Sequence, residues 1–286
     1  MSDKELIKSA FEAKNIKLVK VLLDNSNLDD LLRTSYSWGC SLRDIGAFYN
    51  AAGFNFILDY FYQKKRLDIV KKFFGNSSKL SDASAFLDKK NYKRLRKITH
   101  KNWWILKDHD CLREAIRHNN LFMVEALIQL YRSYNYDFQF VIPSLRYSIE
   151  SNFNDEFRGK NQDFRVLKLL NKEYDKIPQI LINYLFSANN KDLIKVKLQR
   201  IIEIFRLKKI DYYESHILKS LDNKDLFFFL YKNTSKTQKS QFFNLGYYSN
   251  MISLLERKLH DSYCAIDREV ALFLLKNNLK IISKAN

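Results

Sequence analysis

The stretch CLREAIRHNNLFMVEALIQLY, residues 111–131, contains two short apolar helical faces separated by the polar triplet His118-Asn119-Asn120. Leu112 and Ala115 are three residues apart, so they share one face of the first predicted helix. The second predicted helix repeats this pattern with Val124, Leu127 and Ile128. Because a polar break this short leaves room only for a tight connection, the stretch predicts an antiparallel helical hairpin.

The same spacing recurs along the chain, each time around a polar break. The clearest further copies span residues 7–23, 58–74 and 182–198, and weaker ones span 86–98, 218–231 and 242–255. Another copy pairs Ile149 with Val166 and Leu170, and it needs about eight inserted residues around 152–160. The positions equivalent to Ala115 are called anchors here, and they are Ala10, Phe61, Phe86, Ala115, Ile149, Leu185, Leu218 and Phe242. Consecutive anchors lie 24 to 51 residues apart, and several of these separations are near 33 residues. The widest gap has room for one more unit around Leu42, Ile45, Phe54 and Ile57, although such a unit competes with the use of Leu58.

Composition favours an all-α chain. Apolar residues make up 46% of the 286 residues, enough for a substantial core, whereas only six Gly and two Pro are present to build tight sheet turns. Val270, Phe273 and Leu274 predict a terminal helix near 265–283 that caps the last apolar face. We therefore expect an irregular solenoid of about seven or eight antiparallel helical hairpins, forming one continuous domain over residues 1–286.

The spacing Leu112–Ala115–Asn119–Val124–Leu127–Ile128 resembles the helix pair of an ankyrin repeat, and so does Ile7–Ala10–Lys14–Val19–Leu22–Leu23. That family places Leu and Ala in the first helix, Gly at the turn and Val-x-x-Leu-Leu in the second helix. The glycine position here carries Asn119, Lys14, Lys65 and Asn189. Asn tolerates the left-handed turn conformation better than most residues, and Lys tolerates it less well.

The chain also departs from the ankyrin pattern. It contains no Thr-Pro-Leu-His stretch and no Gly-Ala-Asp type of turn after the second helix. The resemblance therefore implies a degenerate, ankyrin-like array. Its glycine-poor composition is similar to that of such arrays in large DNA viruses and intracellular bacteria, which implies a role in engaging host proteins.

The formal net charge of +17 favours an anionic partner, namely nucleic acid, an acidic protein surface or anionic lipid, although a Lys- and Asn-rich composition gives the same charge by bias alone. The densest basic stretch is followed by Trp103 and Trp104, and its cations are Lys89, Lys90, Lys93, Arg94, Arg96, Lys97 and Lys101. In one interpretation these cations contact phosphates while a Trp or Tyr92 stacks on a base. In the other, Leu95 and Ile98 pack inward, the cations form a solvated face and the Trp pair is core. A second, more dispersed basic set consists of Lys195, Lys197, Arg200, Arg206, Lys208 and Lys209.

Motifs for catalysis, cofactors and metals are missing from the sequence. There is no Gly-x-Ser-x-Gly, no HExxH, no phosphate-cradling glycine loop and no dinucleotide fingerprint. Asp108-His109-Asp110-Cys111 contains ligand types without a zinc spacing, and it is better explained as the start of a helix near Cys111. The five histidines are scattered, so we expect neither an enzyme nor a bound cofactor.

Cysteine usage favours an intracellular protein. Cys40, Cys111 and Cys264 are odd in number and form no CxxC, which is typical of reduced thiols. The opening residues MSDKELIKSAF lack an apolar signal core, and no apolar run approaches the ~20 residues needed to span a membrane. We expect a cytoplasmic location, which would be the host cytoplasm for a viral or bacterial protein.

The function predicted from the sequence is binding. The first hypothesis is a protein-interaction module whose extended basic surface meets a partner with an acidic patch. The alternative is a nucleic-acid-binding repeat protein that uses residues 89–101 and 195–209, and an enzyme with an unrecognised all-α site is the third possibility. The insertion at 152–160 is predicted as a loop, either partner-contacting or simply tolerated, and the aromatic clusters at 227–229 and 242–248 as core. The sequence does not predict the oligomeric state.

Overall fold

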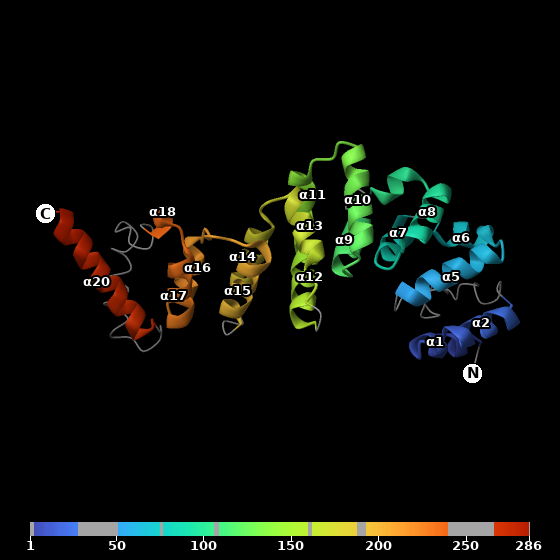
Figure 1. The fold of residues 1–286 in the computed structure, drawn as a ribbon, viewed down its shortest axis with the longest axis horizontal. Coiled ribbons are helices and arrows are strands. Elements are labelled where there is room, and N and C mark those ends of the chain that lie inside the picture. The colour runs from blue at the N-terminus through green and yellow to red at the C-terminus, as the bar shows by residue number, and fades with distance from the viewer. Residues whose placement is uncertain are drawn as a thin grey trace. The chain divides into compact units, whose positions relative to one another are not determined.

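The computed structural model describes residues 3–27, 51–74, 77–105, 109–159, 162–187, 193–239 and 266–285. Within these ranges every regular element is a helix and no strand is present (Figure 1). A parallel bridge joins Ile210 and Thr234 without forming a strand. The all-α prediction is therefore confirmed.

The chain divides into two compact units, Met1–Asp175 (unit 1) and Lys176–Asn286 (unit 2). Unit 1 contains α1 (Asp3–Glu12), α2 (Ile16–Asn25), α5 (Ala51–Gln63), α6 (Leu67–Phe74), α7 (Ser77–Ser84), α8 (Lys89–Ile98), the 3-10 helix η2 (Lys101–Trp104), α9 (Asp110–Arg117), α10 (Leu121–Ser133), α11 (Phe138–Ser144), α12 (Arg146–Arg158) and α13 (Arg165–Glu173). Unit 2 contains α14 (Ile177–Ser187), α15 (Ile194–Phe205), α16 (Glu214–Ser220), α17 (Lys224–Asn233), α18 (Lys236–Lys239) and α20 (Arg268–Ala285). The expectation of one continuous domain stays a prediction. Each repeat of an array contacts chiefly its neighbours, so a division by contacts does not distinguish one continuous array from two domains.

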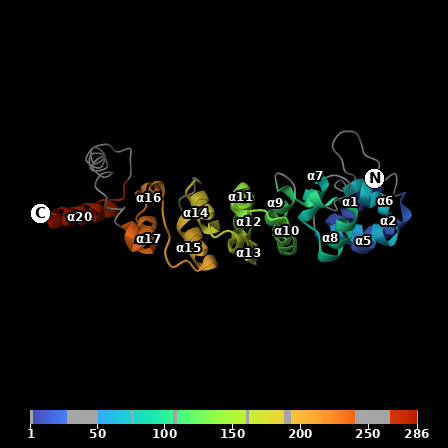
Figure 2. The same cartoon turned by 90° about the horizontal axis from the view of Figure 1, so that it is seen from above.

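Helices that follow one another across a polar break pack as pairs. The pairs are α1 with α2, α5 with α6 and α9 with α10 in unit 1, and α14 with α15 and α16 with α17 in unit 2. Figures 1 and 2 both show α9 and α10 side by side. In this pair Leu112, Ala115, Val124 and Leu127 are fully buried, as the apolar spacing predicts. Burying such side chains is the main favourable contribution to folding.

One turn geometry closes three of the hairpins. Lys14, Lys65 and Asn119 all have a backbone φ between 54° and 56°, in the left-handed region. The next amide donates a hydrogen bond of 2.9–3.0 Å to the carbonyl five residues earlier, and these donor–acceptor pairs are Asn15 to Ala10, Arg66 to Phe61 and Asn120 to Ala115. This arrangement is a Schellman cap, which satisfies carbonyls that a helix end otherwise leaves unpaired. The buried anchor of each hairpin is therefore also the acceptor that closes its turn.

The residue after the left-handed position begins the next helix. Asn15 and Asn120 are the N-caps of α2 and α10, and their side chains accept hydrogen bonds from the amides of Leu18 and Met123. The Asn120 amide group also donates to three carbonyl oxygens of the preceding hairpin, at 3.1–3.2 Å. A single Asn thus ends one helix, begins the next and contacts the neighbouring hairpin.

Polar side chains link hairpins at a nearly constant separation in sequence. Asn152 donates to the Ile116 carbonyl 36 residues earlier, and in unit 2 Lys219 donates to the Phe186 carbonyl 33 residues earlier. Further links in unit 1 span 31 to 37 residues and join Tyr60 to Asp24, Asn55 to Phe86, Asp88 and Asn91, Lys90 and Arg94 to Asp59, and Asn119 to Glu156. The link from Asn152 is buried, and most of the others are partly buried, so they pair polar groups that packing partly removes from water. Their spacing is close to the separation of several predicted anchors.

Two sequence predictions are corrected by the structure. In the segment α7–α8, Leu80 and Ala83 are buried, whereas Phe86 and Ile98 are only half-buried, so the anchor is Ala83 and not Phe86. Residues 152–158, predicted as a loop insertion, form the last turns of α12. Glu156 in this segment accepts hydrogen bonds from the Asn119 side chain and the Asp163 amide, which ties the segment to the hairpin core.

The remaining predicted anchors have different outcomes. Ala10, Phe61, Ile149 and Leu185 are buried, and α20 places the buried Val270 and Leu274 in the predicted terminal helix. Other predictions lie outside the described residues or side chains, namely those for Leu42, Ile45, Asn189, Leu218 and the segment 242–255.

The turn geometry predicts that replacing Lys by Gly has opposite effects on stability at two positions. Lys14→Gly should raise the free energy of unfolding by about 0.5–1 kcal/mol, because glycine adopts the left-handed conformation without the steric cost that Lys carries. Lys20→Gly, at an exposed position inside α2, should lower it by about 1 kcal/mol, because glycine weakens a helix interior. Urea unfolding of both variants measures the difference. Equal destabilisation by the two substitutions would contradict the left-handed turn at residue 14.

Candidate functional site

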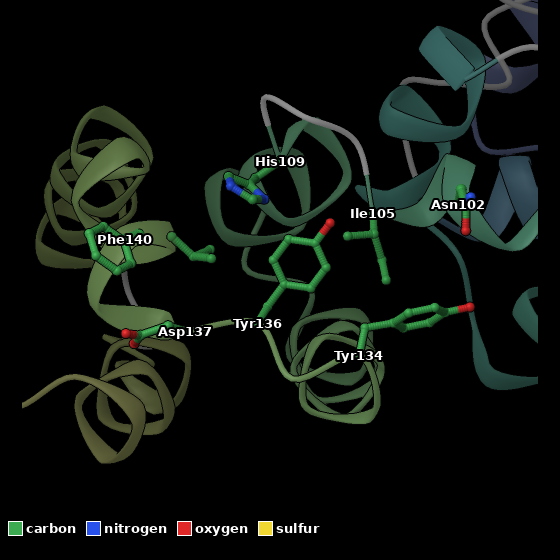
Figure 3. A pocket seen from close by; sticks show the side chains of 8 residues that line it. Asn102, Ile105, His109, Tyr134, Tyr136, Asp137 and Phe140 are labelled. Carbon is green, nitrogen blue, oxygen red and sulfur yellow. The ribbon is translucent and has the colours of Figure 1, made fainter.

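An open groove of about 700 Å³ lies in unit 1 and is rich in aromatic side chains (Figure 3). We call it the aromatic groove, and its lining residues are Asn102, Ile105, His109, Tyr134, Tyr136, Asp137, Phe140 and Val141. Three of its aromatic side chains reach solvent, with exposed fractions of 42% for Tyr134, 44% for Tyr136 and 81% for Phe140. Large aromatic side chains are seldom left this exposed together unless they contact a partner.

A Schellman cap at the end of α10 positions the two tyrosines. Asn135 has a φ of 56°, and the Tyr136 amide donates to the Tyr131 carbonyl at 3.1 Å. This is the same geometry that closes the hairpins, but here no helix follows at once. The reversal at Asn135 therefore places Tyr134 and Tyr136 on either side of a fixed turn.

The Tyr136 ring rests on a buried aromatic support. It meets the Tyr131 ring edge-to-face, with the ring centres 5.4 Å apart, and Tyr131 is fully buried. Burial raises the pKa of Tyr131 well above its usual range, so its hydroxyl keeps its proton. That hydroxyl and His109 Nδ1 lie 3.0 Å apart within a hydrogen bond. His109 itself adopts a left-handed φ of 55° immediately before α9, and it connects the groove to that helix.

The other wall of the groove is built by α11. Asp137 is the N-cap of this helix, and its Oδ1 accepts a hydrogen bond from the Gln139 amide at 2.8 Å. Val141 is buried, whereas the neighbouring Phe140 is exposed to solvent. Figure 3 shows Asp137 and Phe140 together on one side of the central Tyr136 ring, with Ile105 and Tyr134 on the other.

The lining combines aromatic rings with a few polar groups. Aromatic rings supply apolar contact area at low conformational cost, and the Asp137 carboxylate and the Asn102 side chain supply polar atoms. Of the eight lining residues that the structure describes, Asp137 has a carboxylate and none is Lys or Arg. The groove therefore suits a ligand that has apolar surface and hydrogen-bond donors.

The basic stretch 89–101 is divided by the structure into paired and solvated cations. Arg94 Nη1 lies 2.5 Å from Asp59 Oδ1, and Lys90 Nζ lies 2.8 Å from the other oxygen of the same carboxylate. The Arg94 guanidinium also stacks over the ring of Tyr62 at 4.5 Å, and Arg96 lies over that of Tyr92 at 5.6 Å. These arginines thus contribute to packing within unit 1 in addition to charge.

The unpaired cations of this stretch form one stripe. Lys89, Lys93 and Lys97 are exposed at four-residue intervals on α8, and the described part of the chain offers them no ion-pair partner. The Lys101 side chain lies outside the description. The three lysines form a basic surface, called the α8 stripe below, and whether it binds an anion stays a prediction.

Two of the aromatics expected to stack on a base are unavailable for that role. Trp104 is fully buried and donates from Nε1 to the Thr99 hydroxyl at 3.0 Å. Tyr92 is also buried and meets Trp104 edge-to-face at 5.0 Å. Trp103 is half-buried. The burial of Tyr92 and Trp104 therefore agrees with the second interpretation, in which the aromatic side chains are core and the cations form a solvated face.

The second basic set belongs to unit 2. Lys195 Nζ lies 3.9 Å from Asp225, Arg200 lies 3.0 Å from Glu203, and Lys209 donates to the Lys232 carbonyl at 3.2 Å. Arg206 ends α15 in a left-handed conformation, which is the C′ position of another Schellman cap. Arg206 and Lys208 are exposed, whereas Lys197 is half-buried. The set is therefore a mixture of structural and solvated residues.

Reactive and metal-ligating groups do not converge in the described residues. No three His, Cys, Asp or Glu side chains lie close enough there to hold a metal ion. Cys111 is buried, and burial raises the pKa of its thiol to about 12, so the reactive thiolate is disfavoured. Asp110 is the first residue of α9 and pairs with Arg113, and His109 occupies the N-cap position without a side-chain cap, so the helix starts near Cys111 as predicted. No helix in the described ranges has both the length and the apolar composition to cross a membrane.

The groove was not predicted from the sequence, although a signal is present. Residues 131–140, YRSYNYDFQF, contain five aromatics that alternate with polar residues. This spacing does not fit a single buried helix face, on which apolar residues recur every three or four positions. The pattern therefore indicates that some of these aromatic side chains are exposed, as Tyr134, Tyr136 and Phe140 are.

His216 in unit 2 is a structural residue with a pH-dependent role. It stacks on Phe186 with ring centres 4.4 Å apart, and its Nδ1 accepts from the Tyr213 amide at 3.3 Å. Burial, with Lys219 nearby, lowers the pKa of His216 to about 4. The unfolded chain, with an ordinary His pKa, therefore binds a proton more readily than the folded chain does.

Stability should consequently fall as the pH drops through the window between these two pKa values. Between about pH 7.5 and about pH 5 we expect His216 to remove about 2 kcal/mol from the free energy of unfolding, which His216→Asn should largely abolish. Urea unfolding at the two pH values measures this change. His118→Asn, at an exposed position, is the matched control and should retain it. The same pH dependence in His216→Asn as in the original chain would show that His216 is not the responsible group.

The chain was also compared with known proteins. No protein-family model, curated protein or solved structure matches it. The function is therefore inferred from the chemistry of the groove and of the basic surfaces.

Proposed function

We propose that the chain is a non-catalytic protein-binding module, built as an ankyrin-like array of helical hairpins. The repeated Schellman turns at Lys14, Lys65 and Asn119 support the array, as do the polar links that recur at separations near 33 residues. The turn residues occupy the positions at which ankyrin repeats carry glycine. Repeat arrays expose long surfaces and bind through many side chains, so binding is the function that this architecture supports best.

The aromatic groove is the observation that carries the proposal. Tyr134, Tyr136 and Phe140 are exposed together, and Tyr136 is held by a defined turn and a buried ring. Rigid aromatic side chains at the centre of an interface typically supply most of its binding free energy. Covering them with a partner would remove their apolar surface from water at little cost in side-chain entropy.

The partner that we propose has an acidic surface. The net charge of +17 gives the whole chain a field that attracts acidic proteins, and Lys89, Lys93 and Lys97 extend from α8 without ion-pair partners in the described ranges. Solvated charges of this kind steer encounter more than they add affinity. In this proposal the basic surface attracts the partner at long range, and the groove anchors it at short range. The cysteine usage suits an intracellular setting for this interaction.

The second candidate function is nucleic-acid binding through the α8 stripe. Its specific support is the four-residue interval of the three lysines, which places them along one exposed helix face. The burial of Tyr92 and Trp104 removes two of the proposed stacking groups and weakens this candidate. Reversing the charge of the three lysines should abolish a salt-dependent gel shift if nucleic acid is the partner, whereas reversal at Lys8, Lys17 and Lys20 should have less effect.

Site-specific photo-cross-linking tests the proposed function. A benzophenone amino acid at position 140 should form a discrete protein adduct in cells that contain the partner, because Phe140 would lie inside the interface. Tyr147 offers a matched control, since it is an exposed aromatic at 72% exposure but does not line the groove. We expect the adduct from position 140 to be lost with Tyr134→Ala and Tyr136→Ala, and to be absent from position 147.

Two results would contradict the proposed function. Equal cross-linking from positions 140 and 147 would show that the groove is not the contact surface. An adduct that is digested by nuclease and resists protease would transfer the function to nucleic acid.

A further inference from the structure

We propose that the aromatic groove takes an arginine side chain of the partner, paired with Asp137 and stacked on the groove's aromatic rings. This inference rests on the proposed protein-binding function and specifies the chemistry of its anchor. It follows from the composition of the groove and from how the chain accommodates cations elsewhere in unit 1.

Unit 1 already contains one guanidinium held in this way. Arg94 lies over the ring of Tyr62, 4.5 Å from the ring centre, while its Nη1 is 2.5 Å from the Asp59 carboxylate. The aromatic face supplies a cation–π contact and the carboxylate supplies a charge-assisted hydrogen bond. Asp59 and Tyr62 lie on the same helix, α5, so one short segment provides both contacts.

A second cation in unit 1 has the same surroundings. Lys64 Nζ lies over the Tyr60 ring at 5.5 Å and is 2.8 Å from Asp24 Oδ1. The Tyr60 hydroxyl donates to the same carboxylate at 3.0 Å. Tyrosine and aspartate together are thus a recurring cation site in this chain, and in both cases the cation belongs to the chain itself.

The aromatic groove presents the same two groups without an internal cation. Tyr136 and Asp137 are adjacent in sequence and both line the groove, and Tyr134 and Phe140 contribute further rings. Figure 3 shows Asp137 beside Phe140 and on one side of the Tyr136 ring. The eight lining residues include neither Lys nor Arg. Among these eight described residues Asp137 carries a negative charge, whereas the chain as a whole is strongly positive.

Charge complementarity selects the class of ligand. A phosphate or carboxylate would be repelled by the Asp137 charge, and none of the eight described lining residues is Lys or Arg, whereas a guanidinium can donate to the Asp137 carboxylate. Arginine suits the site better than lysine, because its flat and weakly hydrated group stacks on aromatic rings and can pair with both carboxylate oxygens. The net charge of +17 repels strongly basic segments, so we expect a single arginine within an otherwise acidic segment.

Peptide binding tests this inference. The probe is an acidic peptide with one central arginine, compared with the same peptide carrying citrulline, which keeps the shape but lacks the charge. We expect the citrulline peptide to bind the full chain at least about 10-fold more weakly, as measured by calorimetry, because a charged hydrogen-bonded pair is lost. The lysine peptide should lie between the two.

Asp137→Asn is the decisive variant. Asn is as good an N-cap as Asp, so α11 should keep its cap while the groove loses its charge. The preference for arginine over citrulline should then fall to within about twofold, since the ionic partner is absent. Asp82→Asn removes an exposed carboxylate of α7 outside the groove and should leave the preference unchanged.

The possible failures are distinguishable. If the arginine and citrulline peptides bind equally and Tyr134→Ala weakens both, the groove binds peptide but the arginine anchor is wrong. If no acidic peptide binds at all, the inference is overturned as well. The proposed function itself fails only if position 140 also gives no groove-dependent cross-link to a protein.

Discussion

The hydrogen bond from an amide to the carbonyl five residues earlier, closed through a left-handed residue, is the constraint on which the described architecture depends. It occurs at the ends of α1, α5, α9, α10 and α15. Each instance ends a helix and pairs carbonyls that the helix end would leave unsatisfied, and at α1, α5 and α9 it leads directly into the partner helix of a hairpin. None of these left-handed positions is a glycine, so the chain accepts a steric cost at each of them in exchange for short and well-defined connections.

The same device connects the architecture to the proposed function. At Lys14, Lys65 and Asn119 the turn is followed at once by the next helix, and a hairpin results. At Asn135 the next helix starts later, so the turn instead presents Tyr134 and Tyr136 to solvent. The same turn that closes the hairpins thus supports the groove that we propose as the binding surface, and rigid elements commonly carry binding residues in this way.

The hairpins could be predicted from the sequence because apolar spacing reports directly on which helix faces are buried. Ala115 and its equivalents in the clearest copies are buried as the spacing requires. The prediction was wrong at Phe86, because a large aromatic matched the pattern as well as the smaller Ala83 did, and only packing distinguishes them.

Residues 152–158 were mistaken for a loop because their polar side chains bond to distant groups, such as that of Asn119, and local sequence does not reveal such partners. The ion pairs of the basic residues could not be predicted for the same reason, because Asp59 lies 35 residues from its partner Arg94 in the sequence. The groove is lined by η2, by residues that flank α9 and follow α10, and by α11. The sequence shows the aromatic residues of this region but not how these elements are placed together.

Native-state hydrogen exchange tests the shared turn most directly. The amides of Asn15, Arg66, Asn120, Tyr136 and Leu207 each donate to a carbonyl five residues earlier. Each of them should exchange as slowly as the amides in the last turn of the helix that it follows, because opening the turn requires the helix end to open. Exchange of these five amides at the rate of an unstructured peptide would contradict the account, since it would show that the hairpins and the groove are not held by this turn.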